Sequence, residues 1–259
     1  MSNNHLIVTN VDDPDAINDA IIRFQTQGKP HPEAQRIWRW RYVNGIAGRA
    51  IISLVWDGEK IVGHHALALV DFVAGSKKFK IGMGGGTMVD EDYRGRGIYR
   101  MLRNREYEMA ISRNVPMLFG FPNNRVLPLA LKTGSRIHHI PEIVYKPLSL
   151  TKNLPLRDPW GLIVNIGRYI SSRDQARKEG GSQKARNKGI TVKEITSFGD
   201  ETKILWEKLI RSEYVGIQKD VSYLHWRYVL RPNTCFRAFV GFIDDKPSSL
   251  CVIEWDQSE

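Results

Sequence analysis

The sequence predicts an α/β protein in which helices surround a sheet built from hairpins. Three observations carry this prediction. Apolar residues recur at helical spacing within 15–28, and two β-rich runs flank the turn signal Asp57-Gly58. A strand, a basic glycine turn and a helix then follow one another over 78–114. With 42% hydrophobic residues, the 259-residue chain can bury a sizeable core.

The elements before the basic turn follow from periodicity and turn chemistry. The helix over 15–28 has an apolar face made of Ala16, Ile17, Ala20, Ile21 and Phe24. Run 50–72 predicts a β-hairpin because Asp-Gly is a strong two-residue turn signal. Residues 78–89 predict a further strand in the same sheet. Its three consecutive glycines, Gly84 to Gly86, indicate either a bulge that lets a ligand approach the backbone or a curved strand that makes room for packing.

The elements after the basic turn are shorter. A helix is expected from Ile98 to about Asn114, followed by a buried strand at 117–121. A second helix ends near Thr133, where Gly134 suits a C-cap. Residues 143–148 predict one more strand.

A Trp-Arg-Tyr segment occurs twice, as IWRWRYVNG at 37–45 and as LHWRYVLRP at 224–232. Each copy follows a predicted helix and precedes a predicted hairpin, in the same order and at similar spacing. The second copy lacks a glycine-arginine turn, so it predicts half of a repeated domain. This half either completes the first domain or belongs to a shortened chain. The expected divisions are 1–150, a basic linker or flexible loop at 151–195, and the partial repeat at 196–259.

The net charge of +10 and the pI of about 9.6 fit two kinds of partner, a nucleic acid or a phosphate-bearing small molecule. The densest basic region, 168–188, has no aromatic residue after Tyr169 and almost no apolar residue after Ile170. This composition favours a solvated linker over a nucleic-acid arm, so nucleic acid is the less favoured partner.

The apolar runs and the cysteines indicate where in the cell the protein is expected. No run approaches the roughly 18 apolar residues of a membrane span, and no secretion signal is expected at the N-terminus. Cys235 and Cys251 lack metal-site spacing, and so do His138 and His139. We expect a cytoplasmic protein without a bound metal. The sequence leaves open whether the protein forms a homo-oligomer.

The stretch VDEDYRGRGIYRML, from Val89 to Leu102, has the features of an anion site. A helix start leaves backbone N–H groups unpaired, glycines let the backbone curl around a phosphate, and Arg94 and Arg96 add fork-like donors. The spacing matches neither GxxxxGK[ST] nor GxGxxG. A diphosphate is the natural ligand, and a solubilising surface turn is the alternative.

Val89, Arg94-Gly95-Arg96-Gly97-Ile98 and the Gly-Phe-Pro-Asn segment at 120–123 resemble the GNAT (Gcn5-related N-acetyltransferase) superfamily, in particular a bacterial subgroup with the second segment and Trp-Arg-Tyr repeats. The resemblance covers roughly residues 5–148. It implies the acyl-CoA N-acyltransferase fold, a mixed and mostly antiparallel sheet with flanking helices, here followed by a half-repeat. It also implies acetyl-CoA as co-substrate, lying between the fourth and fifth strands.

The resemblance further implies which residues bind the coenzyme. Met88 and Val89 would bond the pantetheine arm through their backbone, the amides of Arg94 to Tyr99 would hold the pyrophosphate, and Asn123 would face the coenzyme from the other side. The expected cofactor-binding residues are therefore Met88, Val89, Arg94, Gly95, Arg96, Gly97, Ile98, Tyr99 and Asn123. Tyr99 stands where many members have Gly or Ala.

The catalytic groups stay unassigned. The family's acid is a Tyr four residues before a glycine, but counting back from Gly134 gives Ala130. Residues 80–89 hold no carboxylate. His64, His65 and Tyr99 are the remaining candidates for base or acid.

The function expected from the resemblance is acetyl transfer from acetyl-CoA to a primary amine of a small molecule, with an amino sugar as the suggested acceptor. The alternative is a non-catalytic module that binds coenzyme A or a partner through a degenerate site.

Overall fold

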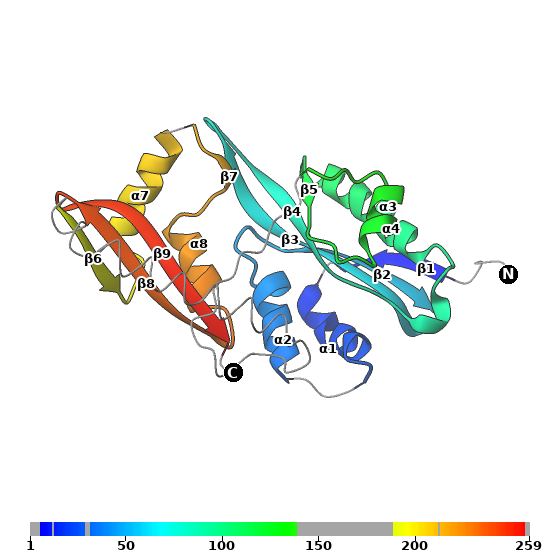
Figure 1. Cartoon of the computed structure of the whole chain (residues 1–259). Coiled ribbons are helices and arrows are strands. Elements are labelled where there is room, and N and C mark those ends of the chain that lie inside the picture. The colour runs from blue at the N-terminus through cyan, green and yellow to red at the C-terminus, as the bar shows by residue number, and fades with distance from the viewer. Residues whose placement is uncertain (1–5, 12, 29–31, 139–188, 212, 257–259) are drawn as a thin grey trace, which may run out of the picture. The chain divides into compact units, whose positions relative to one another are not determined.

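The computed structural model describes residues 6–11, 13–28, 32–138, 189–211 and 213–256 (Figure 1). The strand expected at 143–148, His139 and most of the basic linker lie outside these residues. The elements of the N-terminal part are β1 (Leu6–Asn10), α1 (Pro14–Gln25), α2 (Pro32–Trp38), η1 (Arg39–Val43), β2 (Ile51–Asp57), β3 (Lys60–Ala74), β4 (Lys77–Val89), η2 (Glu91–Tyr93), α3 (Ile98–Ser112), β5 (Leu118–Phe119) and α4 (Leu127–Lys132). The elements that follow are β6 (Ile190–Ile195), α7 (Asp200–Arg211), β7 (Val215–Ile217), α8 (Val221–Leu224), η3 (His225–Val229), β8 (Thr234–Ile243) and β9 (Lys246–Asp256).

The first sheet has the strand order β1-β2-β3-β4-β5 within the described residues. The pairs from β1 to β4 are antiparallel, and β4 pairs with β5 in parallel. The mixed, mostly antiparallel sheet is therefore confirmed. The edge strand β1 was not predicted, because five residues at the start of the chain show no clear alternation.

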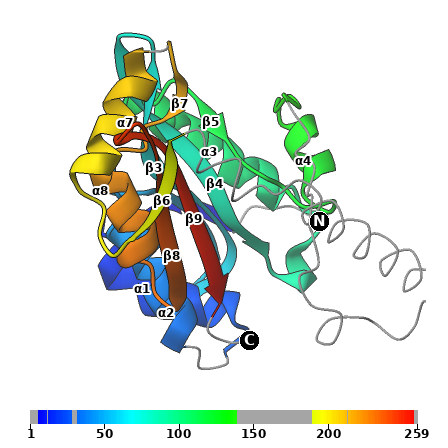
Figure 2. The same ribbon diagram turned by 60° about the vertical axis from the view of Figure 1, so that its left-hand side comes forward.

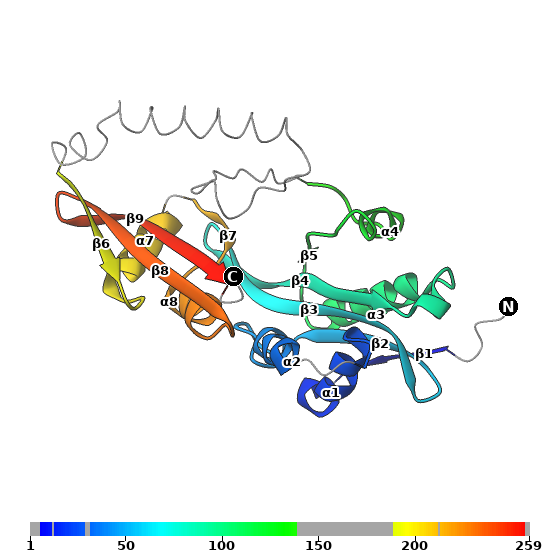
Figure 3. The same ribbon diagram turned by 60° about the horizontal axis from the view of Figure 1, so that its bottom comes forward.

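Helices cover both faces of this sheet: α1 and α2 lie on one face and α3 lies on the other (Figures 1 and 3). On the first face, Ile21, Trp38 and Leu54 belong to one buried cluster. On the second face, Ile98 and Leu102 pack on Val55 and Val62. Burying one such side chain stabilises the fold by roughly 1.5–3 kcal/mol. Because side chains alternate along a strand, the neighbours His64 and His65 of β3 point to opposite faces.

The ladder between β3 and β4 contains a bulge. His64 pairs with Met88 while Ala66 pairs with Gly85, so Gly86 and Thr87 together oppose His65. Gly86 has a φ of +65°, which a residue with a Cβ adopts only with strain. Of the two alternatives expected from the glycine run, the structure shows the bulge.

β5 accompanies β4 for a short distance only. The two strands share two residue pairs, Gly82 with Leu118 and Met83 with Phe119, and the chain then leaves the sheet toward α4 (Figure 2). From Gly84 to Val89, no described strand lies on this side of β4. The helix α4 ends where predicted, with Thr133 at its C-cap and Gly134 at a φ of +92°.

By internal contacts the chain divides into two units, one made of 1–136, 194–239 and 250–259, the other of 137–193 and 240–249. In the first unit, β7 pairs with the far end of β3, so a C-terminal segment extends the first sheet. A second sheet has the order β6-β8-β9, and β6 falls within the range expected as linker. None of the helices seen in the described ranges combines the length and apolar character needed to cross a membrane.

The two Trp-Arg-Tyr segments share one local structure and meet inside the first unit. Each is a π-helical turn: the Asn44 amide bonds the carbonyl of Arg39 at 2.8 Å, and Leu230 bonds His225 at 3.0 Å. The rings of Trp40 and Trp226 stack with centroids 4.5 Å apart. The indole N–H of Trp40 also donates to the carbonyl of Trp226 at 2.9 Å.

Candidate active site

The basic turn forms a cradle of backbone amides in front of α3. Gly95 and Gly97 have φ values of +78° and +77°, and the first helical bond runs from Met101 to the carbonyl of Gly97. The amides of residues 98–100 therefore have no partner inside the helix. No atom lies within 4 Å of a Cβ built on either glycine, so backbone conformation rather than crowding requires glycine here. Such an amide cluster at a helix start suits a phosphate.

The loop that carries the cradle is braced against the β2–β3 hairpin. The Tyr93 hydroxyl donates to Asp57 at 2.6 Å, and this bond raises the pKa of Tyr93. The Arg96 guanidinium lies 4.7 Å from the centre of the Tyr93 ring and donates to the carbonyl of Asp92. Arg94 makes an exposed ion pair with Glu91 at 3.1 Å. Both predicted arginines thus lie beside the cradle, where their charge favours an anion.

Met88 and Val89 have different orientations at the end of β4. The Asp90 amide donates to the carbonyl of Val62 in β3 at 3.0 Å. Because backbone N–H and C=O groups alternate in direction along a strand, those of Val89 point to the open edge of β4. The backbone groups of Met88 point to its partner His64 in β3. The side chain of Met88 lines a pocket on the α1 face.

Asn123 lies between β5 and α4. Its side-chain oxygen accepts the amides of Arg125 and Val126 at 3.1 and 3.0 Å, which fixes the turn into α4. This bonding gives Asn123 a local structural role, and its contact with a coenzyme stays a prediction.

A buried polar network fills the space between α3 and β3. His65 is 5% exposed, Glu106 is fully buried and Arg103 is 8% exposed. One carboxylate oxygen of Glu106 bonds Nδ1 of His65, and the other bonds the Arg103 guanidinium. Arg103 also donates to the Tyr107 hydroxyl at 2.9 Å. Desolvating such charges costs several kcal/mol per ion, so the network persists because its members pair with one another.

Tyr99, the residue that departs from the family pattern, joins this network from the first turn of α3. Its ring meets the His65 ring edge-on, with centroids 6.4 Å apart. Half-burial raises the pKa of its hydroxyl, and Glu106 and Tyr107 act in the same direction, while Arg103 opposes them. Tyr99 therefore packs beside His65 on the α3 face.

His64 occupies the opposite face, where it is fully buried. Its Nδ1 donates to the Gly86 carbonyl at 2.6 Å, and Gln25 approaches the same nitrogen at 3.2 Å. Burial, against the opposing Gly86 bond and with a smaller contribution from the neighbouring His65, lowers the pKa of His64 to about 4. The ring is thus neutral at pH 7. Within the described residues its buried Nε2 has no hydrogen-bond partner.

Arg41 and Tyr42 of the first π-helical turn lie over the bulge on the same face as His64. The guanidinium Nη2 and the Tyr42 hydroxyl are each 2.9 Å from the point where a Cβ on Gly85 would stand. Burial raises the pKa of Tyr42, and Arg41 partly opposes this shift. Among the described residues no carboxylate pairs with Arg41, and its Nε atom is buried without a hydrogen bond. Gly85 is therefore the position that admits two donor side chains to the bulge.

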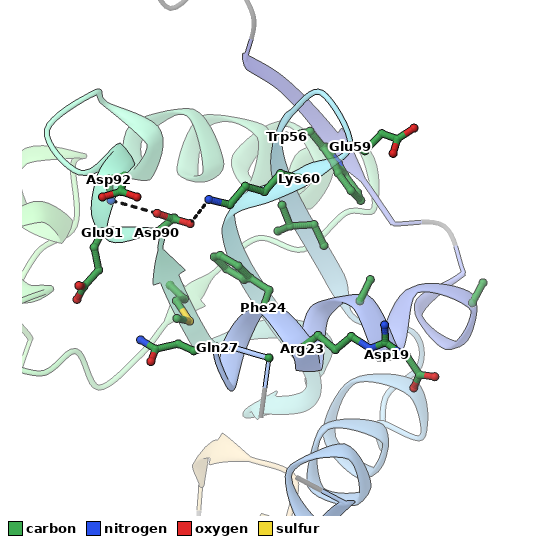
Figure 4. A pocket seen from close by; sticks show the side chains of 15 residues that line it. Asp19, Arg23, Phe24, Gln27, Trp56, Glu59, Lys60, Asp90, Glu91 and Asp92 are labelled. Atoms are coloured by element: carbon green, nitrogen blue, oxygen red, sulfur yellow. Dashed lines mark hydrogen bonds and ion pairs between the residues drawn. The ribbon is translucent and has the colours of Figure 1, made fainter. Parts of the chain in front are cut away.

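A pocket of about 890 Å³ opens on the α1 face next to Met88 (Figure 4). Phe24 from α1 and Trp56 from β2 contribute aromatic rings, and Lys60 reaches Asp90 in an ion pair of 2.8 Å. This bond raises the pKa of Lys60 and lowers that of Asp90. The lining contains five carboxylates and two cations, which are Asp19, Glu59, Asp90, Glu91, Asp92, Arg23 and Lys60. The pocket is thus acidic in a basic chain.

Several of these residues were not predicted. Glu106 carried a usable signal, because it lies four residues after Leu102 and eight after Ile98, on the buried stripe of α3. Arg41 and Tyr42 carried none for this role, since their approach to Gly85 depends on how η1 lies against β4. Among the described residues, no group of three or more potential ligands could hold a metal ion.

Comparison with known proteins bears on the fold and the superfamily. Residues 15–128 match the family model described as acetyltransferase (GNAT) domain. A crystal structure of a conserved protein from Enterococcus faecalis V583, described as a probable N-acyltransferase, is similar over 95% of this chain and 55% of its own, at 9% identity and a TM-score of 0.59. No curated protein sequence matches the chain.

Two smaller enzymes are similar over 54% of this chain, each with a TM-score of 0.42. They are a predicted acetyltransferase with acetyl-CoA from Clostridium acetobutylicum, at 17% identity over 96% of its length, and glucosamine-6-phosphate N-acetyltransferase from Arabidopsis thaliana, at 12% identity over 97%. The family match and the shared fold together support the GNAT acetyltransferase superfamily for residues 15–128.

Proposed function

We propose that the chain is an acetyl-CoA-dependent N-acetyltransferase that acts on the primary amine of a small molecule, by direct transfer in a ternary complex. One observation carries the proposal. β4 parts from β5 before it reaches the cradle, so an open strand edge leads from the amides behind Gly97 to the bulge at Gly86. The GNAT match over 15–128 supports the same reading.

The coenzyme fits this edge as an extended ligand. Its pyrophosphate lies against the amides of residues 94–99, where φ values above +70° at two glycines already curl the backbone. Its pantetheine arm follows the open edge beside Val89, and its thioester lies near Gly84 to Gly86. The proposed coenzyme-binding residues are Val89, Arg94, Gly95, Arg96, Gly97, Ile98, Tyr99 and Asn123. Met88 is left out, because its backbone points to β3 and its side chain lines the pocket on the α1 face.

The α1 face supplies the groups for amine attack. A neutral amine approaches the thioester carbonyl over Gly85, and negative charge develops on the carbonyl oxygen. Arg41 and Tyr42, which lie over Gly85, and the backbone amides of the bulge are placed to donate to this oxygen. His64 is poorly matched to take the ammonium proton, because its pKa of about 4 makes it a weak base at pH 7. The proton therefore leaves through water.

The acidic pocket supports a cationic acceptor. Its carboxylates attract an ammonium group, and the rings of Phe24 and Trp56 offer apolar faces for a sugar ring. We therefore propose an amino sugar as the acceptor class. A pool of acetyl-CoA and such acceptors fits a cytoplasmic location.

We further propose that residues 196–259 form a partial second repeat of the N-terminal half. Two features support it. The hairpin β8-β9 lies in this range, and β6, just before the range, pairs with β8 as β1 pairs with β2. Each copy also has a π-helical Trp-Arg-Tyr turn before its hairpin.

The test is release of coenzyme A thiol from acetyl-CoA over a panel of amines, with the acetylated product identified by mass. We expect turnover with glucosamine-type amines and none with the matched N-acetylated sugars, which lack a free amine. Acetyl-CoA binding without turnover on any amine would favour the alternative, a non-catalytic coenzyme-A-binding module. No binding of acetyl-CoA would contradict both.

A further inference from the structure

The network of His65, Glu106 and Arg103 has no role in the function proposed so far. Charged side chains are rarely buried between a helix and a sheet, where apolar residues pack equally well. On the outer face of the same helix, the pair of Arg105 and Glu108 has the same three-residue spacing but is exposed. The inner pair therefore calls for an explanation beyond helix stability.

We propose that His65 is the general acid that protonates the departing sulfur of coenzyme A, with Glu106 as its positioning residue. The inference rests on the proposed function and deepens it. It supplies the group that the sequence lacks at Ala130, where the family's tyrosine is absent.

The position of the imidazole carries the inference. Its Cε1 and Nε2 atoms lie 3.5 and 3.8 Å from the point where a Cβ on Gly84 would stand, and the carbonyl of Phe119 lies 3.6 Å from that point. Gly84 is the first residue of β4 beyond its pairing with β5. The ring thus borders the place where the two strands part, at ordinary contact distance and without a side chain between.

The hydrogen bonds of the ring leave one nitrogen for chemistry. Nδ1 bonds the Glu106 carboxylate, which accepts only and therefore requires a hydrogen on that nitrogen. Within the described part of the chain, Nε2 has no hydrogen-bond partner. A carboxylate that fixes one nitrogen and frees the other is the arrangement that orients a histidine for proton transfer.

The groups around His65 are consistent with an imidazole that donates a proton on the coenzyme side of the sheet. Glu106, Arg103 and Tyr99 face it from α3, the carbonyl of Phe119 lies toward β5, and His64 points to the other face of the sheet. Arg103 balances the charge of Glu106 when the imidazole is neutral. The acceptor approaches from the α1 face, so His65 serves the sulfur and not the amine.

The proton balance is simple. When the C–S bond breaks, its electron pair goes to sulfur, and the imidazolium Nε2 gives its proton to form the thiol. The amine nitrogen, now bonded to the acetyl carbon, releases one proton to water. The neutral imidazole keeps its Nδ1 hydrogen on Glu106 and regains a proton from water, so one proton is lost and one is gained.

The test compares His65→Gln and Glu106→Gln with the wild type, with Glu108→Gln as the matched control on the exposed face. We expect His65→Gln to lower kcat by about 100-fold while its acetyl-CoA affinity stays within about threefold. The decline of wild-type kcat at high pH, where the imidazolium is lost, should vanish in this variant. Glu106→Gln should shift that decline to lower pH, because the imidazolium loses its anionic partner. Glu108→Gln should match the wild type.

A merely structural role would be indicated if folded His65→Gln kept the wild-type kcat and pH profile, and this result would overturn the assignment. Circular dichroism checks that each variant folds; if Glu106→Gln unfolds, His65→Gln decides alone. If wild-type protein transfers no acetyl group to any amine, the proposed function fails and the assignment fails with it. If the wild-type protein transfers acetyl groups and His65→Gln keeps the same kcat and pH profile, only the assignment of His65 fails.

Discussion

The two Trp-Arg-Tyr segments have the same backbone and different surroundings. In both, the arginine lies over its neighbouring tyrosine ring, at 5.4 Å for Arg41 and 5.1 Å for Arg227. Arg227 is neutralised by Glu254 at 2.9 Å, whereas no described carboxylate pairs with Arg41, which lies over Gly85. The same turn therefore serves packing in one copy and, as far as the described residues show, places a cation without a carboxylate partner at a strand bulge in the other.

The hairpins that follow the two segments differ in the same way. β3 carries His64 and His65 toward the two faces of the first sheet, and both rings bond polar partners. β9 instead contributes Leu250 and Val252 to an apolar cluster around Phe198. The comparison teaches that local structure alone does not make a site, because among the described strands it is the first copy that has a neighbouring strand with a glycine bulge.

The largest expected effect is on the contact between the copies. Trp226→Ala should lower the free energy of unfolding by about 3–5 kcal/mol, because it removes a buried ring stacked on Trp40 and two hydrogen bonds. Urea denaturation measures the change. Val229→Ala, on an exposed side chain of the same turn, should stay within about 0.5 kcal/mol. A loss below about 1 kcal/mol for Trp226→Ala would mean that the segments pack independently.

The next effect is a pH dependence of stability that comes from the buried His64 of the first hairpin. The pKa of His64 is about 4 in the folded protein and 6.5 when unfolded, so the unfolded state binds the extra proton between these values. Stability should therefore fall as pH drops from 6.5 to 4, by about 3 kcal/mol from this group. His64→Gln should remove this part of the pH dependence, as measured by urea denaturation at several pH values. Parallel pH curves for both proteins would contradict the burial of a neutral ring.

The smallest effect on stability is expected for Arg41 and Arg227, which differ instead in their expected effect on activity. Arg41→Gln should lower kcat/KM by about 100-fold, the usual loss when one donor to a developing oxyanion is removed, with little change in stability. Arg227→Gln should leave activity within about twofold and lower stability by about 0–1 kcal/mol, as for partly exposed ion pairs. Steady-state kinetics and denaturation on both variants provide the comparison. Equal activity losses would show that the two copies have the same role.

Much of the fold and part of the site could be predicted from sequence. Turn glycines and apolar periods are local signals, so the hairpin at Asp57-Gly58, the start of α3 at Ile98 and the bulge at Gly86 agree with the structure. The addition of β7 to β3 and the approach of Arg41 to Gly85 depend on contacts between distant segments. No local pattern records such contacts, so these features appeared only in the structure.

The central claim is that the glycine-arginine turn holds the pyrophosphate of acetyl-CoA. Calorimetric titration of acetyl-CoA tests it with Gly97→Asp, which places a carboxylate in the cradle, and with Gly75→Asp, a control at a turn glycine with similarly positive φ and open surroundings. The account predicts that the wild type and Gly75→Asp bind alike, and that folded Gly97→Asp binds at least about 100-fold more weakly, a loss of about 2.7 kcal/mol. Unchanged affinity in folded Gly97→Asp would contradict it.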